Sequence, residues 1–197
     1  MRRTTLLLLL LLAPLAFLMA QDMQLIEFND LRLRTNRRAM TVLGGWAVGN
    51  IAVGSILMNQ REGSDKYFHQ MNVGWNAINL GIASFAYWAA LKSDPASFTL
   101  IESLEEQQKI QKVLLFNAGL DIGYMAGGLY LMERSKNTEK NSDRLKGFGQ
   151  SILLQGAFLF VFDLGSFFVH QSHDKVLHKL ISGLRFDGTS LGLSIAF

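Results

Sequence analysis

Two stretches of this sequence resemble each other and predict the fold: GWAVGNIAVGS at residues 45–55 and GWNAINLGIAS at residues 74–84. They match at Gly, Trp, Asn and Ser, and each lies within a longer apolar block. A block of about twenty apolar residues is long enough to cross the hydrocarbon layer of a bilayer as a helix. Two more such blocks follow, so we expect an all-α membrane protein with a four-helix transmembrane bundle. The predicted spans are residues 39–58, 71–91, 113–132 and 147–170.

The composition favours the same class of protein. Of the 197 residues, 49% are hydrophobic and only 18% are charged, which is more apolar than a soluble domain of this size needs. The chain has no cysteine, so disulfides, thiolate metal sites and cysteine nucleophiles are excluded. Without Arg2 and Arg3 the chain is almost neutral, so nucleic acid is not a predicted partner. No cofactor is predicted.

The first twenty residues have the order of a secretory signal peptide. Arg2 and Arg3 precede the leucine run at 6–12, and the small residue Ala20 precedes a polar stretch. We predict a signal peptide at residues 1–20, with an uncleaved anchor helix as the alternative because Leu18 fits the cleavage rule poorly. Either form places the following segment outside the cytoplasm. The predicted location is the bacterial inner membrane, with a periplasmic mature N-terminus.

Loop charges give a mixed indication of orientation. Arg61 and Lys66, and five basic residues between the third and fourth spans, would lie in the cytoplasm and agree with the positive-inside rule. Four arginines just before the first span oppose it. Because the predicted signal peptide at residues 1–20 outweighs these arginines, we expect the mature N-terminus in the periplasm.

Two flanking segments complete the predicted organisation. Residues 21–38 mix apolar and charged side chains, which is typical of an amphipathic segment at the membrane interface. In the C-terminal tail, residues 172–197, alternating apolar residues flank Asp187 and Gly188, which predicts a short β-hairpin. We expect helix starts at Ser64, at Asp94 with Pro95, and at Ser142.

The repeated stretches have two interpretations. An amide or acid followed by a branched apolar and a small residue recurs at Asn50, Asn79, Asp121 and Asp163. A duplicated helical hairpin would explain this recurrence. Alternatively, membrane helices reuse small and hydrogen-bonding residues wherever they pack.

Helical periodicity places the polar residues of each span on one face. Such faces must turn inward, because an unpaired amide or carboxylate facing lipid costs several kcal/mol. No Lys or Arg lies in any span, so at least one of Asp121 and Asp163 should be neutral or bonded to amides. The third span also carries Gly119, Gly123 and Gly127 on another face, which predicts close contact with a neighbouring helix there. The predicted polar layer consists of Asn50, Asn76, Asn79, Asn117, Asp121, Gln155 and Asp163.

Three functions fit a buried polar layer. It can be hydrogen-bonded packing in a non-enzymatic scaffold or partner-binding protein, which is the leading interpretation. It can bind a proton, a cation or a small polar ligand as part of a transport component centred on Asp121 and Asp163. Hydrolysis by the acid pair is the third, but no nucleophile motif supports it. The predicted partners are the lipid bilayer and a second copy or another membrane protein.

A second group of polar residues follows the fourth span. His170, His173, Asp174 and His178 could hold zinc, since histidine and carboxylate are zinc ligands. The alternative is a set of interfacial histidines with no metal.

Several local motifs together resemble a known family. They are Gly44-Gly45-Trp46, Phe68-His69-Gln70-Met71-Asn72, Phe116-Asn117 with Asp121, and GFGQS at 147–151 with Phe162-Asp163. Over roughly residues 25–171 the chain resembles an uncharacterised family of small bacterial four-helix membrane proteins, a domain of unknown function. The resemblance implies a membrane location and no activity.

Overall fold

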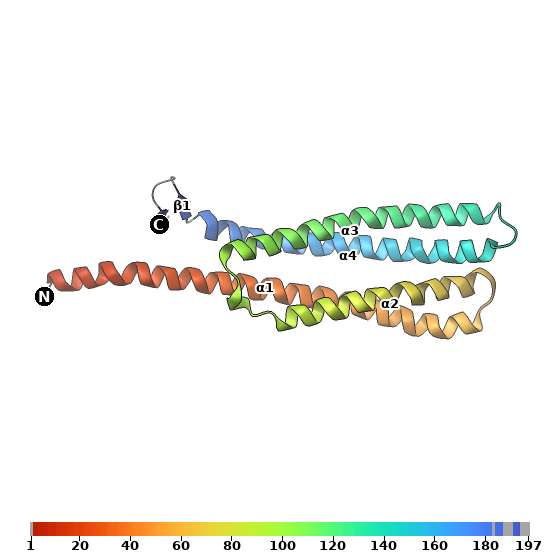
Figure 1. Ribbon diagram of the computed structural model, residues 1–197, viewed down its shortest axis with the longest axis horizontal. Coiled ribbons are helices and arrows are strands. Elements are labelled where there is room, and N and C mark those ends of the chain that lie inside the picture. Colours follow the sequence, from red (N-terminus) through yellow and green to blue (C-terminus); the bar gives the residue numbers. More distant parts are fainter. Residues whose placement is uncertain (1, 183, 187–190, 194–197) are drawn as a thin grey trace.

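The protein consists of two helical hairpins that lie side by side (Figure 1). In this computed structural model, residues 2–182, 184–186 and 191–193 are described, with side chains described over residues 22–177. The first hairpin pairs α1 (Arg2–Gln60) with α2 (Gly63–Lys92), and the second pairs α3 (Leu100–Ser135) with α4 (Ser142–Ser182). The predicted all-helical core with four helices is therefore confirmed.

Short elements connect and end the hairpins. The 3-10 helix η1 (Pro95–Ser97) lies between α2 and α3, at the end opposite the two hairpin loops (Figure 1). The strands β1 (Leu184–Phe186) and β2 (Leu191–Leu193) pair antiparallel. The predicted turn residues Asp187 and Gly188 lie outside the described residues.

Helix starts depend on local capping chemistry. Thr99 caps α3 in a capping box: the Thr99 backbone N–H donates to Glu102 Oε2 at 2.8 Å, and Glu102 N–H donates to Thr99 Oγ1 at 3.3 Å. Asp94 caps η1 instead, so the predicted start of the third helix at Asp94 and Pro95 was wrong. α2 begins at Gly63, one residue before the predicted Ser64.

The N-terminal helix is continuous across three predicted segments. α1 runs without interruption through the predicted leader, the interfacial segment and the first span. Within residues 22–38, Phe28 and Arg32 are 1% and 2% exposed. The Arg32 guanidinium lies 4.7 Å from the Phe98 ring centroid, and Asn29 Nδ2 donates to Ser103 Oγ at 2.9 Å. One face of this segment thus packs against Phe98 and the start of α3.

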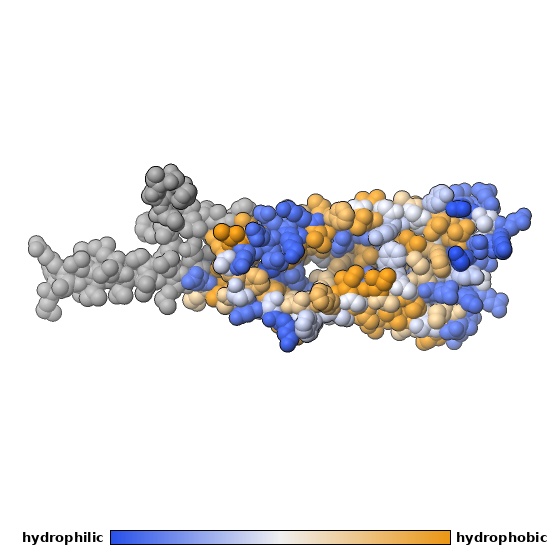
Figure 2. Space-filling model, viewed as in Figure 1, coloured by the Kyte–Doolittle hydropathy of each residue, from blue (hydrophilic) through white to orange (hydrophobic). Residues whose placement is uncertain are grey.

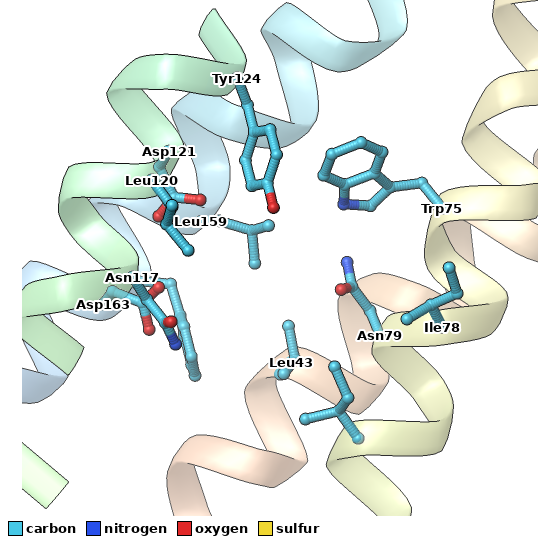
Figure 3. A pocket seen from close by; sticks show the side chains of 12 residues that line it. Leu43, Trp75, Ile78, Asn79, Asn117, Leu120, Asp121, Tyr124, Leu159 and Asp163 are labelled. Carbon is cyan, nitrogen blue, oxygen red and sulfur yellow. The ribbon is translucent and has the colours of Figure 1, made fainter. Parts of the chain in front are cut away.

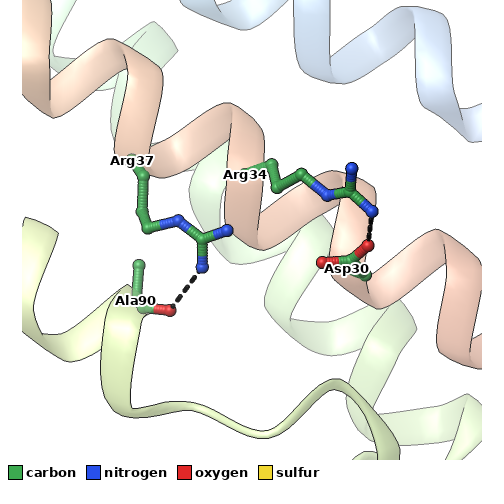
Figure 4. A network of polar contacts seen from close by, with 4 residues as sticks. All are labelled: Asp30, Arg34, Arg37 and Ala90. Atoms are coloured by element: carbon green, nitrogen blue, oxygen red, sulfur yellow. Dashed lines mark hydrogen bonds and ion pairs between the residues drawn. The ribbon is translucent and has the colours of Figure 1, made fainter.

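Charged residues on the opposite side of the same segment form looser contacts. Arg34 pairs with Asp30 one helical turn away, and Arg37 donates to the backbone oxygen of Ala90 on α2 at 3.3 Å (Figure 4). The Arg34 side chain is 57% exposed. An exposed pair of this kind contributes little to stability.

The hairpins join through α4, which packs on α3, on α2 and on α1. In the described part of the chain, the backbones of α2 and α3 stay apart, and the side chains of Trp75 and Tyr124 meet across the space between them. Glycine permits a close crossing of α3 and α4: a Cβ added at Gly128 of α3 would lie 2.7 Å from the backbone oxygen of Gly149 on α4. The predicted contact through Gly119, Gly123 and Gly127 was wrong, since an added Cβ there meets nothing within 4 Å. α3 turns its Asp121 face toward α4, and that face carries Gly128.

Burial in this bundle is inverted relative to a water-soluble protein. Side chains as apolar as Ile78, Phe85, Phe116 and Val161 are 67%, 71%, 68% and 70% exposed. Figure 2 shows hydrophobic residues over the middle of one face and hydrophilic residues at the end that holds the hairpin loops and near the start of α3. The buried polar residues outnumber the buried apolar ones. They are Asn29, Arg32, Asn72, Asn76, Asn79, Ser103, Gln107, Asp121, Ser135, Ser151, Gln155, Asp163 and His170.

Two helices are long and apolar enough to cross a membrane by length and composition. They are Asp22–Gln60 of α1 and Ser142–Leu177 of α4. The second helix and the third carry amides and an acid in their central turns, and these lower the mean hydropathy of both helices.

Candidate functional site: the polar interior and the crevice between two helices

A network of neutral hydrogen bonds joins α1, α2 and α4. Asn72 Oδ1 accepts from Ser151 Oγ at 2.7 Å and from Gln155 Nε2 at 2.9 Å. Gln155 Oε1 in turn accepts from the Trp46 indole N–H at 2.9 Å. Asn72, Ser151 and Gln155 are 4%, 0% and 0% exposed. We call these four residues the Asn72 network; its paired donors and acceptors fix the three helices relative to one another.

An aromatic contact supports the network. The Trp46 ring stacks on Phe158, with ring centroids 4.0 Å apart and planes 6° apart. Sequence reasoning placed Gln155 in the polar layer but not Trp46, Ser151 or Asn72. The two Gly-Trp repeats and the GFGQS motif were the available signals, since both contain residues of this network.

The second polar cluster contains the two acids that lie within the predicted spans. Asp121 of α3 and Asp163 of α4 are 2% and 6% exposed, and both line the same cavity. Two buried carboxyl groups at one site favour a state in which only one of them is ionised. Asp121 Oδ2 accepts from no amide, hydroxyl or cationic group in the described part of the chain. The pair therefore carries one negative charge when it holds one proton.

A cavity of about 390 Å³ lies beside this pair (Figure 3). Its walls come from α2 and α3, and its floor from α4 and from Leu43 of α1. We call it the α2–α3 crevice; it exists because the backbones of these two helices stay apart. The lining residues are Leu43, Trp75, Ile78, Asn79, Ile82, Asn117, Leu120, Asp121, Tyr124, Leu159, Phe162 and Asp163.

Polar atoms without partners lie in opposite walls of the crevice. Asn79 on α2 is 6% exposed and its Nδ2 donates to nothing in the described residues, and Asp121 Oδ2 on α3 likewise has no partner there. Figure 3 shows both side chains directed toward the space between the helices. Trp75 and Tyr124 meet edge to face across the same space, with centroids 5.0 Å apart. A buried donor and a buried acceptor left unpaired are suited to a ligand that supplies both partners.

The predicted single polar layer is divided between the two clusters. Asn79, Asn117, Asp121 and Asp163 line the crevice. Gln155 belongs to the Asn72 network, and Asn76 donates to the backbone oxygen of Asn72 at 2.9 Å. Asn50 belongs to neither cluster, because its amide donates back to Trp46 O of its own helix at 2.9 Å.

Glutamine side chains of α3 contact the histidine cluster near the end of α4. Both oxygens of Asp174 accept from Gln111 Nε2 at 2.9 Å, and Gln107 Nε2 donates to Asp174 Oδ1 at 2.9 Å. The rings of His170 and His173 have centroids 6.0 Å apart. Among the residues with described side chains, no three potential ligands are grouped to hold a metal ion. The side chain of His178 lies outside the described set, so zinc binding stays a prediction.

The fold and its interior define a class: a four-helix protein with a polar core and an apolar exterior. The chain belongs to a family of unknown function (DUF6992), whose model matches residues 42–164. No curated protein and no solved structure matches it. The matched segment contains the Asn72 network and the α2–α3 crevice, and it excludes Arg32 and His170.

Proposed function

We propose that this protein is a four-span integral protein of the bacterial inner membrane that acts without catalysis, as a scaffold or partner-binding subunit. The observation that carries this proposal is the inverted burial of the bundle. Large apolar side chains are exposed on all four helices, as Val53, Ile78, Phe116 and Val161 illustrate. In water, such a surface would favour aggregation. In a bilayer, the same apolar side chains would contact the apolar lipid chains.

The second and third helices fit this proposal although their average hydropathy is modest. Their polar residues are buried, as Asn72, Asn76 and Asn79 of α2 and Asp121 of α3 demonstrate. Lipid would therefore contact only their apolar faces. Mean hydropathy averages the polar and the apolar face of a helix, so it underestimates how well the apolar face of such a helix fits lipid.

Charge supports the proposed orientation. The two hairpin loops lie at the same end of the molecule (Figure 1). Lys136, Lys140, Arg144 and Lys146 cluster at this end. We place this end in the cytoplasm. The α2–α3 connection then lies in the periplasm.

Cysteine accessibility tests this arrangement in a chain that contains no cysteine. In whole cells, a membrane-impermeant maleimide should label Ala96→Cys, and it should label Lys140→Cys only after the inner membrane is permeabilised. Phe85→Cys, at the proposed lipid surface, should stay unlabelled in both conditions. Labelling of all three positions in a soluble fraction would contradict the proposal.

The Asn72 network supports the scaffold function. Its donors and acceptors satisfy one another, and it contains no titratable group, so it supplies rigidity and not chemistry. A scaffold has to present a constant outer surface to its partner. We propose that this partner is a second copy or another membrane protein.

A second candidate function rests on a specific observation. The acid pair in the crevice faces unpartnered polar atoms and no cationic side chain, which favours a site for a proton or cation in a transport component. Reconstituted vesicles with an internal pH dye would test it. Asp121→Asn with Asp163→Asn should abolish flux, whereas the exposed control Glu105→Gln should not. If the unmodified protein gives no flux, the scaffold function stands alone.

A further inference from the structure

The volume and the lining of the α2–α3 crevice suit an occupant larger than a bare ion. Its volume of about 390 Å³ lies within the range of cavities that bind small organic molecules. A bare cation would occupy only a small part of it. Eight of the twelve lining residues have apolar or aromatic side chains without a charge or an amide. An occupant of this crevice therefore needs an apolar body as well as a polar group.

The distribution of polarity indicates how this occupant is oriented. Ile78 and Ile82 of α2 and Leu120 of α3 are 67%, 54% and 42% exposed, and they form an apolar rim. Asn79, Asp121 and Asp163 are buried behind it. A molecule that approaches from the proposed hydrocarbon layer would place its polar end inward and its chain outward.

Charge and hydrogen bonding define the polar end. An acid pair that holds one proton has a single negative charge, and no Lys or Arg of the four predicted spans can balance it. An ammonium group supplies the positive charge and can donate to a carboxyl oxygen of the pair. Asn79 Nδ2, in the opposite wall, needs an acceptor. The aromatic rings of Trp75 and Tyr124 also line the crevice, and aromatic rings attract cations.

We infer that the α2–α3 crevice binds a lipophilic amino alcohol, whose ammonium group pairs with Asp121 and Asp163 and whose hydroxyl oxygen accepts from Asn79. This inference rests on the second candidate function, because both use the same acid pair. It goes further by naming the class of ligand and by giving the apolar rim and Asn79 a role.

Thermal unfolding of the full chain in detergent micelles at pH 7 tests the inference with three probes of equal chain length: 2-amino-1-octanol, octylamine and 1-octanol. Amines of this kind are protonated at pH 7. Because a ligand that binds the folded state raises Tm, we expect 2-amino-1-octanol to raise Tm by at least ~5 °C relative to 1-octanol. Octylamine should give a smaller rise.

Variants separate the two contacts. Asp121→Asn with Asp163→Asn should remove the difference between the amines and the alcohol. Asn79→Ala should reduce the effect of 2-amino-1-octanol to that of octylamine, and the control Asn59→Ala at the end of α1 should change nothing. If the double acid variant does not fold, Leu43→Phe tests the same site, since it narrows the crevice without altering an acid.

Equal Tm shifts from the three probes, or shifts that persist in all crevice variants, would overturn the inference. The second candidate function has its own readout, because flux is measured without any amine. Flux that depends on Asp121 and Asp163 together with equal probe shifts would reject the amino alcohol and keep the ion site.

Discussion

Gln155 Nε2 lies 2.9 Å from Asn72 Oδ1 and joins α4 to a residue 83 positions earlier in the chain. The same Asn72 oxygen accepts from Ser151, so one carbonyl oxygen connects α2 to two successive turns of α4. Gln155 also accepts from Trp46 of α1. These few bonds account for much of the polar contact between the two hairpins.

Asn72→Leu should destabilise the bundle. The variant leaves two buried donors without a partner, and each unsatisfied group costs about 1–3 kcal/mol. Urea or thermal unfolding in detergent would measure the loss. The exposed Asn59→Leu is the matched control. If Asn72→Leu with Gln155→Leu loses the sum of the two single effects, the bonds between them are not coupled as we describe.

Gly128→Ala should lower stability, whereas Gly123→Ala should preserve or raise it. An added Cβ at Gly128 lies 2.7 Å from Gly149 O and 2.9 Å from Leu153 N, so α3 and α4 must separate. At Gly123 nothing lies within 4 Å, and alanine is the better helix former by about 1 kcal/mol. Both variants can be compared by thermal unfolding in the same detergent. Equal losses would contradict the crossing at Gly128.

Arg32→Ala should release residues 22–38 from the bundle. The guanidinium stacks on Phe98, and within the segment it donates from Nη2 to Asn29 Oδ1 at 3.1 Å. Its loss removes the contact with Phe98, which joins this segment to the rest of the bundle. We expect faster proteolysis between residues 22 and 38. Arg34→Ala is the control, because its pair with Asp30 is exposed (Figure 4). Equal cleavage rates for the two variants would show that Arg32 does not hold the segment.

The capping box of α3 should make the start of this helix sensitive to acid. Hydrogen bonds from the Thr99 backbone and side chain lower the pKa of Glu102 below its ordinary value. A carboxylate with a lowered pKa stabilises the folded state above its ordinary pKa, and this contribution is lost as the pH falls through the lowered value. In an NMR titration, Thr99→Ala should move the pKa of Glu102 upward. An unchanged titration would mean that the box does not form.

The positions of the helices could be predicted from the sequence, and their packing could not. Apolar blocks and periodicity locate four helices and show that Asp121 and Asp163 share a face with other polar residues. Periodicity does not tell which face meets a neighbour. The glycines at 119, 123 and 127 illustrate this limit. Their regular spacing predicts a helix contact, but the contact with α4 is made by the polar face that carries Gly128.

Hydrogen-bond partners across helices were also beyond the sequence. Asn50 and Asn79 occupy equivalent places in the two repeated stretches, yet the Asn50 amide bonds to its own helix and Asn79 lines the crevice. The difference depends on the register between α1, α2 and α4. That register is set by close crossings such as Gly147 of α4 with Ser64 of α2, which involve residues far apart in the chain.

The wide spacing of the α2 and α3 backbones has a mechanical consequence. α4 packs on each of the other three helices, whereas α2 and α3 meet through side chains such as Trp75 and Tyr124. The spacing of α2 and α3 is therefore fixed indirectly, through the bonds that Asn72 makes with Ser151 and Gln155 on α4.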